Sequence, residues 1–231
     1  MKKFLSTTFI IFAIAGLTAI IGAGVYGVLH ESDDSTIQTL PLPEKTGGVR
    51  GQLGIDKNIN EGNIDQYLGR ADSVYRDMRM LVDEADYANI GGDSYLSGFV
   101  EGFEVVPYPK LVNVSGLPPE VGQSYQGPTL FTQSSFGLKA NYLESEDILE
   151  YFFPKDKNIF LMCGGGGYAG MTKNLLTQLG WDENRIWVVG GYWYYNGEHA
   201  VQVKRQMGTE TVYDFWKVNY HDLDFTELHE K

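Results

Sequence analysis

The chain has 231 residues, of which 43% are hydrophobic and 13% aromatic, so it can bury a sizeable core and should form one domain with attachments. Its 18 basic and 30 acidic residues give a formal net charge of -12, which disfavours binding to nucleic acid or to an anionic membrane surface. Cys163 is the only cysteine, which excludes an intramolecular disulfide and a lipid-modified N-terminal cysteine and leaves one free thiol.

The N-terminal segment from Phe4 to Leu29 contains no charged residue and exceeds the roughly 20 residues that span a bilayer as a helix. Two lysines precede it and acidic residues follow it, so the positive-inside bias places the N-terminus in the cytoplasm. We therefore expect residues 1–30 to form a transmembrane anchor in the cell membrane, with the rest of the chain on the extracytoplasmic side. The alternative is a cleaved signal peptide and a secreted protein.

Residues 31–60 are polar and contain several glycines and prolines without a sustained apolar period, which predicts a flexible linker. The predicted folded domain then covers residues 61–231. Its first elements are a short helix around Ile64–Leu68 and a strand around Ser73–Met78. The stretch FEVVPYPKL, Phe103–Leu111, is predicted to be a strand that ends at its prolines.

Residues 112–140 are rich in Gly, Pro, Ser and Gln and are predicted to form a long surface insertion. A helix is expected at about Glu144–Phe153, because acidic residues in its first turn complement the helix dipole. Both elements precede the most informative stretch of the sequence.

The stretch from Lys157 to Gly191 has the pattern of a βαβ unit. The apolar run NIFLM ends at Cys163, four glycines follow, and the next helix has one apolar face and ends at Gly180. The run RIWVV is then a second buried strand. This order predicts a parallel sheet with Cys163 at the carboxyl end of a strand, which is where open α/β sheets bind ligands.

Two nucleotide-binding motifs match the glycine loop only in part. Gly165-x-Gly167-x-x-Gly170 fits the dinucleotide fingerprint, but the second strand ends in Val-Val-Gly-Gly where an acidic residue should hold the ribose. The loop also approaches the P-loop pattern, but Met171 replaces the phosphate-binding lysine. We therefore expect no nucleotide and no other cofactor.

A third interpretation begins with the thiol. Cys163 precedes a glycine-rich turn and a helix N-terminus, whose amides and dipole create positive potential. This setting is expected to lower the thiol pKa from about 8.5 and to give a nucleophilic thiolate. The loop amides that would then cradle a small anion belong to Gly164, Gly165, Gly166, Gly167, Tyr168 and Ala169. Such a site favours sulfane-sulfur or phosphoryl transfer, whereas the alternative is a buried, inert cysteine.

These features resemble a rhodanese domain, whose active-site loop C-x-x-G-x-R runs into a helix that ends in L-L-x-x-x-G-[FW]. Cys163 and Gly166 match the loop, and LLTQLGW matches the helix end. IWVVGGYWYY resembles the family's next strand and aromatic turn, and YLSGFVEGFEVVPYPKL resembles its G-H-I-x-G-A-x-x-I-P segment. VYRDMRML resembles the D-x-R strand end through Asp77 and Arg79. The resemblance covers about Ile64–Lys204, with the motifs in the expected order.

The resemblance implies a rhodanese-like α/β fold, with a central parallel sheet flanked by helices. It also implies a sulfurtransferase that moves sulfane sulfur through a Cys163 persulfide, without a metal. The partners would be a small sulfane-sulfur donor and a thiol acceptor. We expect Asp77 and Arg79 to be a structural pair, and Tyr192 and Trp193 to wall the pocket over the thiol.

The sequence also departs from the family pattern. Tyr168 stands where rhodanese domains usually carry arginine, and Ala169 stands where the related dual-specificity phosphatases carry theirs. Phosphoryl transfer through cysteine depends on a bidentate guanidinium, so a phosphatase is the less favoured alternative. A catalytically inactive binding or redox-sensing module is the other. His199, His221 and His229 show no metal-ligand spacing and are expected at the surface.

Overall fold

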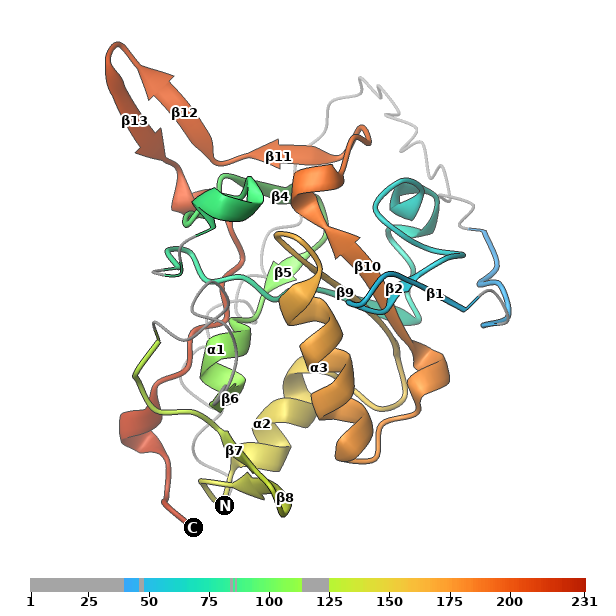
Figure 1. Cartoon of the computed structure of the whole chain (residues 1–231), viewed down its shortest axis with the longest axis vertical. Coiled ribbons are helices and arrows are strands. Elements are labelled where there is room, and N and C mark those ends of the chain that lie inside the picture. Colours follow the sequence, from blue (N-terminus) through green and yellow to red (C-terminus); the bar gives the residue numbers. More distant parts are fainter. Residues whose placement is uncertain (1–39, 46–47, 84, 86, 114–124) are drawn as a thin grey trace, which may run out of the picture. The chain divides into compact units, whose positions relative to one another are not determined.

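The computed structural model describes residues 40–45, 48–83, 85, 87–113 and 125–231 (Figure 1). At its centre lies a four-stranded parallel sheet with the strand order β10-β9-β3-β5. These strands are β3 (Ser73–Asp77), β5 (Glu104–Val105), β9 (Asn158–Cys163) and β10 (Ile186–Gly191). The prediction of an α/β fold with a parallel sheet flanked by helices is confirmed.

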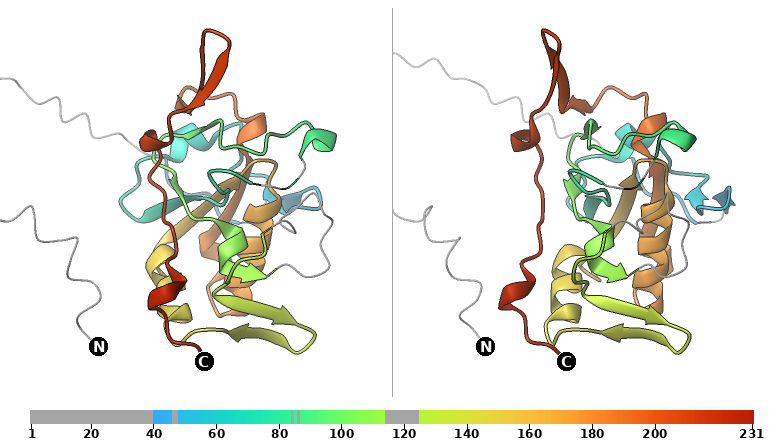
Figure 2. Two further views of the ribbon diagram at one scale, coloured as in Figure 1. Left: turned by 90° about the vertical axis from the view of Figure 1, so that its left-hand side faces the viewer. Right: turned by 60° about the vertical axis from the view of Figure 1, so that its left-hand side comes forward.

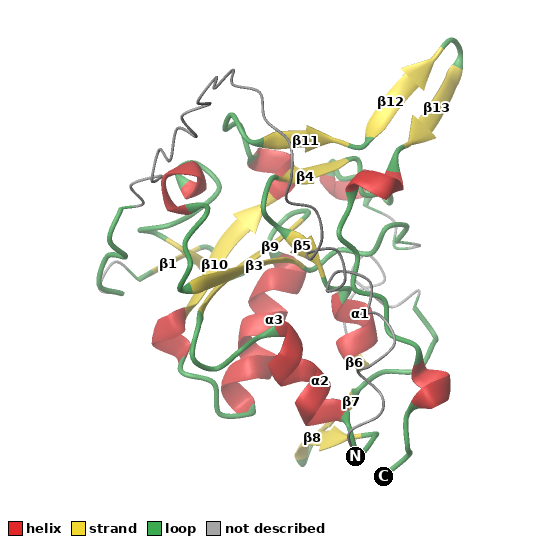
Figure 3. Cartoon of the chain, turned by 180° about the vertical axis from the view of Figure 1, so that it is seen from behind, coloured by secondary structure: helices red, strands yellow, loops and turns green. Residues whose placement is uncertain are grey.

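Three α-helices pack against this sheet, and Figure 3 shows them gathered on one side of it. They are α1 (Tyr108–Leu111), α2 (Ser145–Phe152) and α3 (Gly167–Gln178). On β9, Ile159, Leu161 and Cys163 belong to the hydrophobic core on the helical side, whereas Phe160 and Met162 belong to a second core. This alternation follows from the two-residue period of a strand, and it directs the thiol toward α3.

The second core lies on the opposite face of the sheet. Phe160, Trp187 and Val189 pack there with Ile59 and Ile64, and the last of these belongs to a 3-10 turn at the position of the predicted first helix. β9 and β10 are thus buried on both faces, as expected for strands of a parallel sheet. Burial on both faces explains why the sequences of these two strands are almost continuously apolar.

The remaining strands form small sheets around the central one. They are β1 (Val49–Arg50) with β2 (Ile55–Asp56), β4 (Gly98–Val100) with β11 (Ala200–Gln202), β12 (Lys204–Met207) with β13 (Glu210–Tyr213), and β6 (Val112–Asn113) with β7 (Phe131–Ser134) and β8 (Gly137–Ala140). Figure 2 shows the β12–β13 hairpin projecting away from the central sheet.

Two stretches differ from the sequence-based expectation. Phe103–Leu111 is not one strand, because the chain turns after β5 and enters α1 through Pro107 and Pro109. Proline is tolerated in the first turn of a helix, where its missing N–H has no intrahelical partner to lose. Residues 112–140 contain the β6–β7–β8 sheet as well as loop, and residues 114–124 lie outside the described part.

The linker predicted over residues 31–60 is corrected at its C-terminal end. β1 pairs with β2, Ile59 is fully buried, and Ile55 packs against the core on the helical side. The carbonyl oxygen of Leu53 would lie only 2.4 Å from a Cβ atom added at Gly170, so this segment lies directly on α3. The composition of the segment is polar, but a few apolar side chains suffice to dock it on the domain.

Among the described residues, no helix is both long enough and apolar enough to cross a membrane. The anchor predicted over residues 1–30 lies outside the described part of the chain. Its membrane placement therefore stays a prediction.

Candidate functional site

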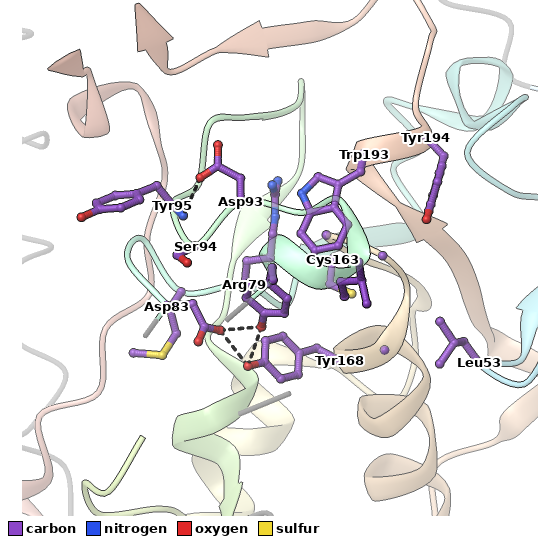
Figure 4. Close-up of a pocket in the computed structure, with 16 residues that line it drawn as sticks. Leu53, Arg79, Asp83, Asp93, Ser94, Tyr95, Cys163, Tyr168, Trp193 and Tyr194 are labelled. Carbon is purple, nitrogen blue, oxygen red and sulfur yellow. Dashed lines mark hydrogen bonds between the residues drawn. The ribbon is translucent and has the colours of Figure 1, made fainter. Parts of the chain in front are cut away.

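The carboxyl ends of β3, β9 and β10 meet at one edge of the central sheet. β9 ends at Cys163, and the loops that follow β3 and β10 bring Arg79 and Trp193 to the same place. All three residues line a cavity of about 260 Å³ (Figure 4). The predicted position of Cys163 at a strand end is confirmed, and it coincides with this cavity.

The glycine turn after Cys163 joins β9 to α3 in a conformation that needs glycine at two positions. Gly166 has a φ of 101°, in the left-handed region that side chains disfavour, and α3 begins at the next residue. At Gly164 an added Cβ atom would lie 2.5 Å from the indole ring of Trp193. The backbone N–H of Trp193 also donates to the Gly164 carbonyl, at 3.1 Å. The indole is therefore packed directly on the turn.

The Cys163 thiol is only 2% exposed, and its Sγ accepts the Gly166 N–H at 3.1 Å. Burial raises the pKa of this thiol above its ordinary value, and the negative charge of Asp77 acts in the same direction. Hydrogen bonds from the Ala169 and Gly166 amides, and the charge of Arg79, lower the pKa but do not outweigh burial. The expectation of a lowered pKa is thus wrong, because desolvation of the anion exceeds the effect of the amides.

The six loop residues predicted to form an anion cradle divide into two groups. Gly166 and Ala169 direct their N–H groups at the sulfur. Gly164, Gly165, Gly167 and Tyr168 line the cavity. The loop therefore lies around the thiol, and among the described residues two of its amides bond to the sulfur. Its role as an anion cradle stays a prediction.

Tyr168, at the position where rhodanese domains usually carry arginine, is buried and fully bonded. Its hydroxyl donates to Asp83 Oδ2 at 2.7 Å, and the Tyr87 hydroxyl lies within hydrogen-bonding distance of both groups, at 3.0 Å and 2.9 Å. Burial, followed by the charge of Asp83, raises the pKa of both phenols, so both remain neutral donors. We call Asp83, Tyr87 and Tyr168 the tyrosine–aspartate cluster.

Arg79 and Asp77 form the buried pair that the sequence predicted. Arg79 Nε donates to Asp77 Oδ1 at 3.0 Å, and Nη2 donates to Asp77 Oδ2 and to the carbonyl of Gly98. Burial acts to lower the pKa of Arg79, but Asp77 outweighs it and raises the pKa. Nη1 is buried and has no hydrogen-bond partner among the described residues. Arg79, which lines the Cys163 cavity, therefore keeps one buried donor without a partner among the described residues.

The two aromatic residues predicted to wall the pocket have different positions. Trp193 lines the Cys163 cavity, and its Nε1 is buried without a hydrogen-bond partner among the residues that the structure describes. Tyr192 lies instead beneath the Arg79 guanidinium, with 4.9 Å between the guanidinium carbon and the ring centroid, and lines a neighbouring open cleft. Only Trp193 is therefore a wall of the site.

Two carboxylates also line the cavity, and both already have partners. Asp83 accepts the two tyrosine hydroxyls and the Ala85 N–H. Asp93 accepts the Tyr95 N–H and lies 3.4 Å from the Lys204 ammonium. Aromatic rings contribute much of the remaining lining, from Tyr87, Tyr95, Tyr168, Trp193 and Tyr194.

Sequence reasoning missed Asp83, Tyr87 and Asp93. They lie in the irregular segment after β3, where no periodicity marks an inward-facing side chain. The sequence does contain one usable signal. A carboxylate near a strand end is buried only when hydrogen-bond donors lie close to it, so a nearby donor residue marks a candidate. The tyrosine four residues after Asp83 is such a donor.

The three late histidines each bond a glutamate, namely His199 with Glu101, His221 with Glu104 and His229 with Glu144. None of them lines the Cys163 cavity. Across the described ranges, no group of three or more His, Cys, Asp or Glu side chains is placed to hold a metal ion.

Comparisons with family models, with curated proteins and with solved structures gave no match to this chain. The resemblance to rhodanese domains therefore stays a prediction from the sequence motifs.

Proposed function

We propose that the protein is a rhodanese-like sulfurtransferase that carries sulfane sulfur as a persulfide on Cys163, on the extracytoplasmic side of the cell membrane. The observation that carries the proposal is the position of the Cys163 sulfur. It lies at the end of a parallel strand, accepts an amide hydrogen of the glycine turn that opens α3, and faces a cavity of about 260 Å³. The cavity accommodates a small donor beside the thiol.

The reaction has two sulfur-transfer steps. The Cys163 thiolate attacks the sulfane sulfur of a donor X–S⁻, a new S–S bond forms, and X leaves with the electron pair of the broken bond. A thiolate acceptor then attacks the outer sulfur of the Cys163 persulfide, and Cys163 leaves as a thiolate. The amides of Gly166 and Ala169 stabilise the anion on Sγ, as donors fixed in place before the reaction.

The proton on Sγ has to leave before the first step. Because burial raises the pKa of Cys163, the resting protein holds a thiol. The rate of persulfide formation is therefore expected to rise with pH through the alkaline range, in contrast to the flat profile of a preformed thiolate.

The test is the mass of the full chain after incubation with inorganic polysulfide. We expect one extra sulfur atom that is removed by a thiol reductant, and we expect the same treatment to leave Cys163→Ser unchanged. Equal sulfur uptake by the parent protein and by Cys163→Ser would contradict the proposal. Release of the sulfur to a thiol acceptor then establishes turnover.

A non-catalytic binding module is the second candidate, and the burial of the thiol with its raised pKa favours it. Such a module takes up no sulfur, and its buried neutral thiol also reacts slowly with peroxide, which disfavours a redox-sensing module. A phosphatase is disfavoured, because Arg79 is engaged by Asp77 and two further carboxylates line the cavity. A phosphate dianion would meet those carboxylates without a free bidentate guanidinium.

A further inference from the structure

Among the described residues that line the Cys163 cavity, the buried side-chain nitrogen and oxygen atoms without a hydrogen-bond partner are both donors. Arg79 Nη1 and Trp193 Nε1 are both buried, and neither has a partner among the described residues. Arg79 as a whole is only 7% exposed. In the view of Figure 4, the guanidinium and the indole nitrogen lie toward the same end of the cavity. Because an unpartnered buried donor carries a desolvation cost, this pair points to a ligand that supplies acceptor atoms.

The charges around the cavity limit the total charge of that ligand. The charge of Arg79 is balanced by Asp77, and Asp93 lies near Lys204. Among the described residues, the hydrogen bonds to Asp83 come from neutral donors, two hydroxyls and one amide. The site therefore suits a neutral or singly charged ligand better than a dianion.

The size and the chemistry of the walls indicate the rest of the ligand. Tyr87, Tyr95 and Tyr194 supply aromatic surface around the cavity. Its volume of about 260 Å³ lies below the ~300–1,000 Å³ of pockets for drug-sized molecules. The ligand therefore has a small organic group as well as acceptor atoms.

We propose that the sulfur donor of this site is a small organic thiosulfonate, R–SO₂–S⁻, an inference that rests on the sulfurtransferase function proposed above. Its two sulfonyl oxygens accept from Arg79 Nη1 and Trp193 Nε1. Its organic group lies against the aromatic walls, and its single negative charge avoids the second charge of inorganic thiosulfate. Both oxygens are bonded to the sulfonyl sulfur, which departs as part of the sulfinate. Arg79 and Trp193 therefore donate to the group on which negative charge develops.

The transfer balances without a further reactant. The Cys163 thiolate forms an S–S bond to the sulfane sulfur, and the S–S bond of the thiosulfonate breaks. The sulfinate R–SO₂⁻ leaves with the electron pair, so one persulfide anion and one sulfinate anion replace one thiolate and one thiosulfonate anion. Arg79 and Trp193 then hold the departing sulfinate oxygens.

The first experiment compares three donors with the full chain by the rate of persulfide formation. The donors are benzenethiosulfonate, thiosulfate and inorganic polysulfide. We expect kcat/KM for benzenethiosulfonate to exceed that for thiosulfate by roughly 10-fold or more. Thiosulfate would place one more negative charge near the Asp83 carboxylate, and this repulsion lowers its kcat/KM. Equal use of the two oxygen-containing donors would overturn the inference.

The second experiment uses Trp193→Phe, which keeps an aromatic ring on the glycine turn and removes only the Nε1–H donor. We expect kcat/KM for benzenethiosulfonate to fall roughly 10- to 100-fold, because a hydrogen bond to a charged oxygen is lost. The rate with polysulfide, which has no oxygen, should fall by a smaller factor, because that donor makes no such bond, so the ratio of the two rates is the quantity to compare. Trp187→Phe is the matched control, since Trp187 Nε1 is also buried and has no partner within the described ranges, but Trp187 lies in the core on the opposite face of the sheet.

The outcomes separate this inference from the proposed function. If polysulfide loads Cys163 but benzenethiosulfonate does not, the sulfurtransferase stands and the thiosulfonate assignment fails. If Trp193→Phe slows both donors equally, the indole has a structural role and the assignment also fails. If no donor loads Cys163, the sulfurtransferase function itself is wrong.

Discussion

The two sides of the Cys163 cavity differ in how their polar groups are satisfied. Around Tyr168, the tyrosine–aspartate cluster is internally bonded, with Tyr168 and Tyr87 both directed at Asp83. On the other side, Arg79 and Trp193 each leave one buried donor unpaired among the described residues. The polar groups of the first side bond to one another, whereas the two donors of the second side do not. The difference favours the proposal that a ligand is recognised by Arg79 and Trp193, and not by the tyrosine–aspartate cluster.

The largest expected effect is on the side of Arg79 and Trp193. Asp77→Ala should lower the free energy of unfolding by about 3–5 kcal/mol, because it leaves the buried Arg79 guanidinium without its counter-charge. Asp72→Ala, which removes an exposed partner of Arg70, is the control and should cost about 0–1 kcal/mol. Urea unfolding measures both. A loss below 1 kcal/mol for Asp77→Ala would mean that Arg79 finds another partner and is not held by this pair.

A smaller effect is expected on the internally bonded side. Tyr168→Phe removes one donor to the buried Asp83 and should lower the free energy of unfolding by about 1–3 kcal/mol. Tyr151→Phe, at an exposed position on α2, should change it by no more than about 0.5 kcal/mol. The preference between benzenethiosulfonate and thiosulfate should stay the same in Tyr168→Phe. A reversed preference would show that this side of the cavity also selects the donor.

The smallest expected effect concerns the thiol between the two sides. Because folding raises the pKa of Cys163, the stabilisation from the buried neutral thiol is complete below the unfolded-state pKa of about 8.5 and is lost as pH rises through the folded-state pKa. Between these values, the parent should lose up to about 1.4 kcal/mol per pH unit relative to Cys163→Ala. Urea unfolding from pH 7 to pH 10 tests this. A parent that gains stability relative to Cys163→Ala above pH 8.5 would instead indicate a lowered pKa.

The sequence predicted the part of the fold whose signals are local. The strand that ends at Cys163, the helix after it and the strand of β10 have apolar runs and glycine boundaries, and each lies where expected. The pairing of Asp77 with Arg79 was predictable because both lie at one strand end, two residues apart. These features depend on residues that are neighbours in the chain.

The rest depends on distances that the sequence does not contain. The unpaired Nη1 of Arg79 follows from which neighbours reach the guanidinium, and the pKa of Cys163 follows from how completely the fold excludes water. A glycine turn alone suggests a stabilised thiolate. Only the packed structure shows that desolvation has the larger effect.

The segment from residue 48 to Ile59 limits how far the chain can be shortened from its N-terminus without loss of the cavity and the second core. A fragment that began at residue 61, where the polar composition ends, would lack Leu53, which lines the Cys163 cavity, and Ile59, which fills the second core. It would also expose Gly170 and the first turn of α3, which the Leu53 carbonyl covers. Leu42 also packs against the second core, and Lys45 lies over the Trp187 ring, so truncation studies should keep residue 40 and everything after it. Loss of activity in a shorter fragment would reflect a missing part of the cavity or core.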